Sequence, residues 1–238
     1  MLRIIPNKIH ITRPFRLPLI RPFHIDNSCV LCLLPEIGSK WLDCSKYRNN
    51  GTIVGAIIKQ GRYGPALQLD GVDDYADCGN DASLKPTKVV TMEFWINPSS
   101  YSTVPANHKF GFLQQNGYTF WQWANNGVPI CWDVELNKIG GTRRNLDLSL
   151  NAIPLNTNTH IVIIFDAENG KLTVYKNGAF FQEGSILVGD IVYSGNFFIG
   201  YKFKGFIDEM RIYNRALSAE EIRGNMFASK RYRFMRGV

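Results

Sequence analysis

Five aromatic side chains and several amides lie close together in one stretch of the sequence, a combination suited to holding a sugar. Aromatic faces stack on the apolar faces of sugar rings, and side-chain amides exchange hydrogen bonds with hydroxyl groups. Alternation along a strand sends neighbours such as Phe120 and Trp121 to opposite faces, so only part of this set is exposed. Core packing is the alternative for each ring. The predicted ligand-binding residues are Tyr118, Trp121, Trp123, Asn125, Asn126 and Trp132.

Cysteine is the second residue type that could do chemistry. Cys29 and Cys32 form a C-x-x-C pair, but no second pair and no suitably spaced histidines follow to complete a zinc site. The five cysteines are an odd number with irregular spacing, which indicates no disulfide framework. We therefore interpret them as buried free thiols.

Catalytic motifs are missing from the sequence. The chain contains no G-x-S-x-G turn around a serine nucleophile, no H-E-x-x-H metal site and no glycine-rich phosphate loop. The four histidines are scattered, and His160 stands at the start of a predicted strand. We expect the protein not to be an enzyme and to have no catalytic residues.

The elements that must position these residues are predominantly strands. Short apolar or alternating runs separated by turn residues recur from residue 29 onward, which is typical of all-β domains. Strands are predicted at residues 29–34, 66–69, 75–78, 89–96, 110–113, 118–123, 128–134, 160–166, 171–176, 179–181, 197–201 and 205–213. Large apolar side chains within them are expected to fill the space between two sheets: Phe94, Trp95, Ile207, Met210, Ile212 and Tyr213.

Two local sequence patterns predict a turn between strands and the start of a helix. Asn177 and Gly178 predict a tight hairpin turn, because both tolerate positive φ. Ser218 and Glu221 have the spacing of a capping box and predict that a helix begins there. Its apolar positions are Leu217, Ile222 and Met226.

Five segments in this order resemble the laminin-G-like jelly-roll domains of the concanavalin A-like lectin/glucanase superfamily. They are residues 43–52 (DCSKYRNNGT), 61–75 (GRYGPALQLDGVDDY), 91–98 (TMEFWINP), 160–178 and 205–222 (GFIDEMRIYNRALSAEEI). The resemblance implies an all-β, two-sheet antiparallel β-sandwich (jelly roll, concanavalin A-like) with one short C-terminal helix and an extended N-terminal arm. Glucan-hydrolysing relatives carry carboxylates as E-x-D-x-x-E on one strand, and none of the eight glutamates fits that spacing.

A structural calcium ion is a further implication of this resemblance. Members of the family often hold Ca²⁺ between the loop after the first strand and the last sheet strand, and the matching positions are Asp43 and Asp208, with carbonyls near Asn50 and Gly51. The alternative is that Asp43 caps its own turn while Asp208 pairs with a nearby arginine. Asp73 and Asp74 are interpreted as shaping the turn before Tyr75.

Positive charge is concentrated at the two ends of the chain. The formal net charge is +7, but residues 1–28 hold five basic residues against one acidic, and residues 223–238 hold five against none. We divide the chain into an extended, proline-rich arm (1–28), a sandwich (29–226) and a basic tail (227–238). An acidic partner for these ends is expected, and the alternative is that they only keep the protein soluble. The residues predicted to make assembly contacts in the arm are Arg13, Phe15, Arg21 and Phe23.

Two functional hypotheses follow. The first is a non-catalytic structural subunit that forms a homo-oligomer or joins other subunits through its arm, such as a virion or phage surface component. The alternative is a free-standing, lectin-like module that binds a glycan or a protein; a glycoside hydrolase is the least favoured. The chain shows no secretory pattern and no apolar run long enough to cross a membrane, so we expect cytoplasmic synthesis, with a virion as the destination of an assembly subunit.

Overall fold

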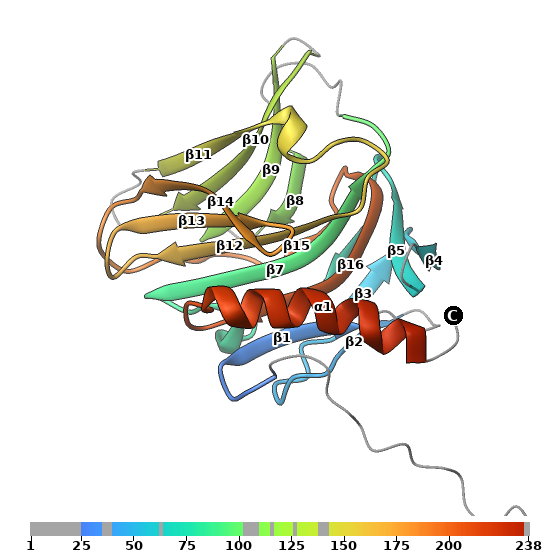
Figure 1. Ribbon diagram of the computed structural model, residues 1–238, viewed down its shortest axis with the longest axis horizontal. Coiled ribbons are helices and arrows are strands. Elements are labelled where there is room, and N and C mark those ends of the chain that lie inside the picture. Colours follow the sequence, from blue (N-terminus) through green and yellow to red (C-terminus); the bar gives the residue numbers. More distant parts are fainter. Residues whose placement is uncertain are drawn as a thin grey trace, which may run out of the picture.

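The fold is known from a computed structural model, which describes residues 25–34, 40–61, 64–101, 110–114, 117–125, 128–137 and 143–235. Within these ranges the chain forms sixteen strands, two short 3-10 turns (Ala82–Leu84 and Leu150–Ala152) and one α-helix. Each strand pairing among the described residues is antiparallel. The strands form two facing sheets, and the helix lies outside them (Figure 1).

Sheet A carries the helix and has the strand order β1-β16-β7-β12-β13-β14, with β5 and β4 beside β16. β5 and β1 share one edge of β16, because β5 pairs with residues 204–207 and β1 with residues 210–213. The bounds are β1 (Cys29–Leu34), β4 (Ile57–Gly61), β5 (Gly64–Asp70), β7 (Val89–Pro98), β12 (Thr159–Asp166), β13 (Lys171–Lys176), β14 (Ala179–Ser185) and β16 (Lys204–Tyr213).

Sheet B has the order β11-β10-β9-β8-β15-β6-β3-β2. β2 also pairs with β1, which joins the two sheets at one side. At the other side the edges approach each other, because Gln182 of β14 donates a hydrogen bond to the Asp147 carbonyl of β11 at 3.2 Å. The bounds are β2 (Lys40–Asp43), β3 (Gly51–Val54), β6 (Tyr75–Asp77), β8 (Phe110–Gln114), β9 (Tyr118–Asn125), β10 (Val128–Asn137), β11 (Arg143–Ser149) and β15 (Phe198–Ile199).

The main core lies between the sheets and is built from alternate residues of each strand. On β9 and β10 the rings of Phe120 and Trp132 stack at a centroid distance of 5.4 Å, and Phe94 of β7 reaches Phe120 from the opposite sheet at 5.5 Å. Burial of such aromatic side chains contributes on the order of 2 kcal/mol each. This core holds the two sheets in one rigid position relative to each other.

Helix α1 (Ala219–Met235) covers the outer face of sheet A, running across β7, β16 and β1 (Figure 1). Beneath it lies a second apolar cluster in which Leu217 and Ile222 meet Cys29, Val162 and Ile164. The predicted capping box is confirmed: Glu221 N donates to Ser218 Oγ at 3.2 Å, and Ser218 N donates to Glu221 Oε2 at 2.8 Å. Residues 227–235, predicted to belong to a separate tail, continue this helix, because alanine, lysine and arginine favour helical structure.

The predicted sandwich with one C-terminal helix is confirmed. The hairpin turn at Asn177 and Gly178 is also confirmed, with φ angles of 52° and 78°. Four strands were missed, namely β2, β3, β4 and β11. No helix in the described part of the chain is long and apolar enough to span a membrane.

Candidate functional site

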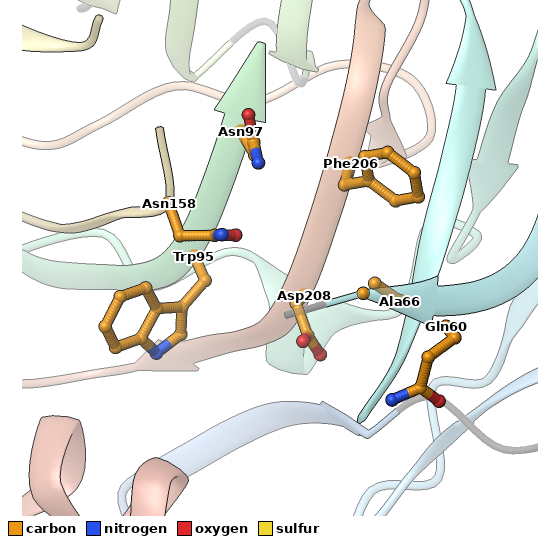
Figure 2. Close-up of a pocket in the computed structure, with 8 residues that line it drawn as sticks. Gln60, Ala66, Trp95, Asn97, Asn158, Phe206 and Asp208 are labelled. Carbon is orange, nitrogen blue, oxygen red and sulfur yellow. The ribbon is translucent and has the colours of Figure 1, made fainter. Parts of the chain in front are cut away.

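A cavity of about 280 Å³ opens on the outer face of sheet A, beyond the part that α1 covers (Figure 2). Its walls come from β4, β5, β7 and β16 and from the loop that precedes β12. We call it the Trp95 pocket. Its lining residues are Gln60, Gly61, Ala66, Trp95, Asn97, Asn158, Phe206 and Asp208.

Asp208 lines this pocket directly before a β-bulge in β16. The pairing of β16 with β7 shifts between Asp208 and Arg211, and Glu209 adopts a φ of 52°, which is uncommon for a residue other than glycine. The bulge lies where β5 ends its pairing with β16 and β1 begins. Ile207 and Met210 therefore both face the core, while Asp208 points outward into the pocket.

The neighbouring strand β7, on which Trp95 pairs with Asp208, forms another wall of the pocket. Phe94 and Ile96 face the core, so Trp95 and Asn97 point to the outer face and line the pocket. The prediction that Trp95 fills the space between the sheets is therefore wrong. Tyr213 is likewise on the outer face, buried beneath α1 in the second cluster.

The pocket combines three kinds of group that together suit a polyhydroxylated ligand. Trp95 and Phe206 provide aromatic rings, while Gln60, Asn97 and Asn158 provide amides that both donate and accept hydrogen bonds. Asp208 is a carboxylate that is 8% exposed. Trp95 is fixed from behind, because the His160 ring contacts it at a centroid distance of 5.1 Å.

A buried ionic network lies beside the pocket, on the same outer face of sheet A and beneath α1. Glu93 Oε1 accepts from His160 Nε2 at 2.9 Å and lies 3.3 Å from Arg211, and Glu93 Oε2 accepts from Asn225 of α1 at 2.8 Å. Burial alone would raise the pKa of Glu93, but the Arg211 charge and the bonds from His160 and Asn225 outweigh it and lower the pKa. Arg211 also pairs with Glu209 at 2.8 Å. The network thus joins the bulge, the pocket wall and the helix.

The predicted aromatic binding set does not form one surface. Tyr118 and Trp132 face the main core, and the Tyr118 hydroxyl donates to the Leu84 carbonyl at 3.2 Å. Trp121 is 7% exposed, whereas Trp123 is 41% exposed and available to a ligand. The Asn125 side chain and the whole of Asn126 lie outside the described residues.

The Asp43 carboxylate, one of the predicted calcium ligands, is already bound by donors of its own part of the fold. Both carboxylate oxygens of Asp43 already accept hydrogen bonds, from the amides of Cys32, Ser45 and Asn49 and from the Ser45 hydroxyl, at 2.7 to 2.8 Å. Asn50 Oδ1 accepts from the Asp43 amide, and Gly51 begins β3 against Trp41. A calcium ion would have to displace these donors, so the structure favours the alternative in which Asp43 caps its own loop.

One group of three acidic side chains in the described part of the chain has its oxygens within 4.8 Å of one another, at Asp70, Asp73 and Asp74. Asp74 Oδ2 accepts from the Asp70 amide at 2.8 Å, as expected of a residue that shapes this turn. Burial, followed by the nearby charges of Asp70 and Asp73, raises the pKa of Asp74. We assign the group no ligand.

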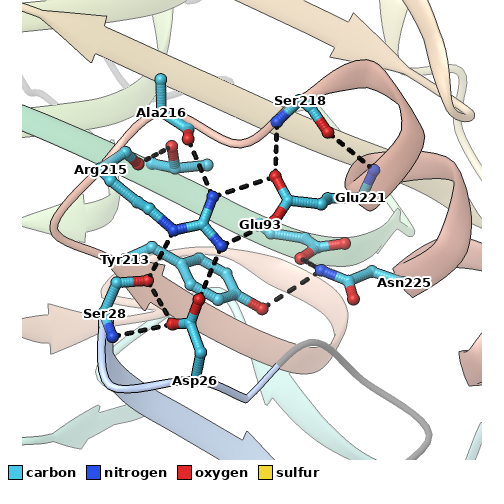
Figure 3. A network of polar contacts seen from close by, with 10 residues as sticks. Asp26, Ser28, Glu93, Tyr213, Arg215, Ala216, Ser218, Glu221 and Asn225 are labelled. Atoms are coloured by element: carbon cyan, nitrogen blue, oxygen red, sulfur yellow. Dashed lines mark hydrogen bonds and ion pairs between the residues drawn. The ribbon is translucent and has the colours of Figure 1, made fainter.

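The assembly residues predicted in the arm (Arg13, Phe15, Arg21 and Phe23) lie outside the described residues. The structure does show how the segment before β1 is attached (Figure 3). Arg215 donates to Ser28 Oγ at 2.9 Å and to Asp26 Oδ2 at 2.8 Å, and it also pairs with Glu221 at 2.7 Å. This clamp ties residues 26–28 to the start of α1.

The two-sheet antiparallel sandwich agrees with the family that the sequence matches. A family model described as "Concanavalin A-like lectin/glucanases superfamily" matches residues 70–223. The chain belongs to this superfamily, which confirms the resemblance inferred from the sequence. No curated protein sequence matches it.

Solved structures with the same fold include binding domains of clostridial toxins. The binding domain of Paraclostridial Mosquitocidal Protein 1 is 19% identical with a TM-score of 0.66, over 84% of this chain and 52% of that one. The botulinum neurotoxin serotype D ligand binding domain in complex with N-acetylneuraminic acid is 17% identical with a TM-score of 0.66, over 84% and 50%. The botulinum neurotoxin DC binding domain in complex with rat synaptotagmin II is 14% identical with a TM-score of 0.65, over 86% and 52%. The chain thus spans about half the length of these proteins, and the likeness concerns the fold.

Proposed function

We propose that the protein is a non-catalytic recognition module that binds a saccharide in the Trp95 pocket. The observation that carries this proposal is the composition of a cavity of about 280 Å³, which brings together two aromatic rings, three amides and one carboxylate. Ligand sites of this kind pair an apolar wall with a few polar groups that fix orientation. The volume lies just below the roughly 300 to 1,000 Å³ of sites for drug-sized ligands, which favours a single sugar ring.

The acidic residues at the pocket support binding rather than hydrolysis. Glycoside hydrolysis requires two carboxyl groups on either side of the bond, and among the lining residues that the structure describes Asp208 is the one carboxylate. Its neighbour Glu209 pairs with Arg211 at 2.8 Å and is 2% exposed, so it does not serve as the second group.

If the protein does hydrolyse glycosides, another pair of acidic side chains is the first place to look for the catalytic groups. Asp133 and Glu135 lie two residues apart on β10, facing away from the core, and are 5% and 3% exposed. Incubation of the full chain with a panel of β-glucans should release no reducing ends. Hydrolysis that Asp133→Asn or Glu135→Gln abolished would overturn the non-catalytic part of the proposal.

The binding site is tested by a glycan array followed by calorimetric titration of the best ligand. Asn97→Ala should weaken binding about fivefold or more through the loss of one oriented amide. Trp123→Ala is the matched control, because Trp123 is 41% exposed and lies on β9 of the other sheet. If Asn97→Ala bound normally and Trp123→Ala abolished binding, the site would have to be moved to sheet B.

Attachment through the ends of the chain is the second part of the proposal. Its support is the sequence alone: five basic residues against one acidic in residues 1–28, together with the aromatic residues Phe15 and Phe23. We propose that these residues join copies of the chain or other subunits, as in a virion surface component, while the sandwich presents its pocket.

A further inference from the structure

We infer that His160 positions the Trp95 ring for the saccharide, and that helix α1 holds His160 in place. The His160 side chain has no exposure to solvent, so it acts on a ligand through its neighbours and is a positioning residue. The inference rests on the proposed function and extends it, because it makes the affinity of the pocket depend on the attachment of α1.

His160 and Trp95 lie directly opposite each other on the neighbouring strands β12 and β7. Both side chains point to the outer face of sheet A, because Ile161 and Phe94 beside them face the core. The two ring centroids are 5.1 Å apart, and the ring planes are inclined at 49°. Aromatic pairs at such distances attract each other beyond the effect of burial, and the attraction depends on the angle between the rings. The imidazole therefore limits the orientations that the indole adopts in the pocket wall.

A hydrogen bond to Glu93 fixes the plane of the imidazole. His160 Nε2 lies 2.9 Å from Glu93 Oε1. The pKa of Glu93 is lowered, so Glu93 is a carboxylate that only accepts hydrogen bonds, and His160 Nε2 must carry the proton. Among the described residues His160 Nδ1 has no hydrogen-bond partner, so the bond to Glu93 is the one that orients the ring.

Helix α1 holds Glu93 and, through it, the imidazole. Asn225 of α1 donates from Nδ2 to Glu93 Oε2 at 2.8 Å (Figure 3), while Glu93 Oε1 accepts from His160. One oxygen of the carboxylate is thus bound from the helix and the other from β12. Without the bond from Asn225 the carboxylate would be free to turn about Oε1, so it would hold the imidazole less firmly.

The same helix packs against the turn that holds the His160 backbone. Asn177 Oδ1 accepts from His160 N at 3.0 Å, and Asn177 N donates to the His160 carbonyl at 2.8 Å. The next residue, Gly178, lies against α1, because a Cβ at this position would be 3.2 to 3.3 Å from side-chain atoms of Arg223 and Met226. The helix therefore restrains both the side chain and the backbone of His160, and a shift of the helix would reach the pocket wall.

The positioning is tested without a ligand by fluorine NMR of the full chain labelled with fluorinated tryptophan, in which Trp95→Phe identifies the Trp95 signal among the five tryptophans. Asn225→Ala should shift or broaden this signal although the His160 ring stays in place. Ile164→Ala is the matched control, because Ile164 is buried on the same face of β12, beneath α1, and pairs with Thr91. It should lower the melting temperature and leave the Trp95 signal unchanged. An unchanged signal in Asn225→Ala, or the same change in Ile164→Ala, would overturn the role of the helix.

The effect on binding is measured by calorimetric titration of the full chain with glucose, galactose, mannose and N-acetylglucosamine. His160→Gln keeps a donor near Glu93 but removes the ring, and it should weaken binding about fivefold. His160→Phe restores a ring beside Trp95, so it should bind more tightly than His160→Gln. Asn225→Ala should weaken binding about twofold, because it acts through two intervening residues.

The outcomes separate this inference from the proposed function. Equal affinity of the wild-type protein, His160→Gln and Asn225→Ala would overturn the positioning role and leave the saccharide site standing. Binding by His160→Phe that is no tighter than binding by His160→Gln would show that the ring contact does not matter. If neither these sugars nor the glycan array showed binding, the proposed function would be wrong, and the fluorine spectra would still decide whether α1 positions Trp95.

Discussion

The guanidinium of Arg211 lies 3.3 Å from the carboxylate of Glu93, and neither side chain is exposed to solvent. The pair lies between sheet A and α1, and it is extended by Glu209 on one side and by His160 and Asn225 on the other. A buried charge is tolerated only when its partners remain in place. The stability of the pocket wall therefore depends on a few polar residues.

Removal of one member of this pair should destabilise the protein strongly. Glu93→Gln leaves the buried Arg211 with Glu209 as its remaining carboxylate partner, and the free energy of unfolding should fall by about 3 to 5 kcal/mol. The double variant Glu93→Leu with Arg211→Met should lose less stability than the sum of the losses caused by Glu93→Leu and by Arg211→Met alone, because it removes both charges of the pair together. Urea denaturation of the wild-type protein, Glu93→Leu, Arg211→Met and the double variant measures this coupling, and Glu93→Gln is measured in the same way. Additive effects would show that the pair does not act as a unit.

The local features of the fold could be predicted from the sequence because each depends on neighbouring residues. The capping box needs only Ser218 and Glu221, and the hairpin needs only Asn177 and Gly178. The missed strand β11 contains Arg143, Arg144, Asn145 and Asp147 among its seven residues, so its apolar signal is weak. β2 and β3 have four residues each, too few to show alternation.

The candidate site could not be predicted in the same way. Because α1 covers part of the outer face of sheet A, both faces of β7 are largely buried. The core-facing Met92, Phe94 and Ile96 alternate with Thr91, Glu93 and Asn97, and this alternation places Trp95 on the outer face. Trp95 was nevertheless assigned to the space between the sheets because its side chain is large and apolar. Alternation around Ile207 places Phe206 and Asp208 on the outer face. The bulge after Asp208, which returns Met210 to the core, is a pairing irregularity between strands distant in sequence, and nothing in the residues 205–213 indicates it.

Acid should unfold the protein in a defined pH range. The Arg215 hydrogen bond, which outweighs burial, lowers the pKa of Glu221 from its usual 4.5 to about 2. Since the pKa is lower in the folded state, the stabilisation is complete above pH 4.5 and is lost as the pH falls towards 2. Glu93 contributes with the same sign, because its pKa is also lowered.

The variant Glu221→Gln should isolate the helix-capping part of this effect. At pH 7 it should lose about 1 kcal/mol of stability, and the difference from the wild-type protein should narrow below pH 3. Glu220→Gln is the control, because Glu220 stands beside Glu221 but is exposed. Circular dichroism during acid titration follows the transition. A constant difference between wild type and Glu221→Gln at all pH values would contradict the assignment of the lowered pKa to Glu221.

Calcium should leave the thermal stability unchanged. The Asp43 carboxylate accepts four hydrogen bonds within its own part of the fold, and these already occupy its oxygens. Asp43→Ala should cost about 3 kcal/mol, because several buried donors lose a charged acceptor. Scanning calorimetry with calcium chloride and with a chelator measures both points. A calcium-dependent rise in melting temperature that Asp43→Ala removed would restore the metal site.

Deletion of residues 1–24 should separate assembly from ligand binding. The deletion stops before Asp26 and Ser28, because these residues are bound to Arg215 and their loss would weaken the attachment of α1. We expect the full chain to form oligomers and the shortened chain to be a monomer with the same melting temperature and the same affinity for its saccharide. Light scattering coupled to size-exclusion chromatography gives the masses.

The variant with Phe15→Ala and Phe23→Ala keeps the charge of the arm, so loss of oligomers in this variant would assign assembly to apolar contacts. Identical masses for the full and shortened chains would remove the arm from the assembly proposal, while the pocket proposal would stand, because the described lining residues all belong to the sandwich.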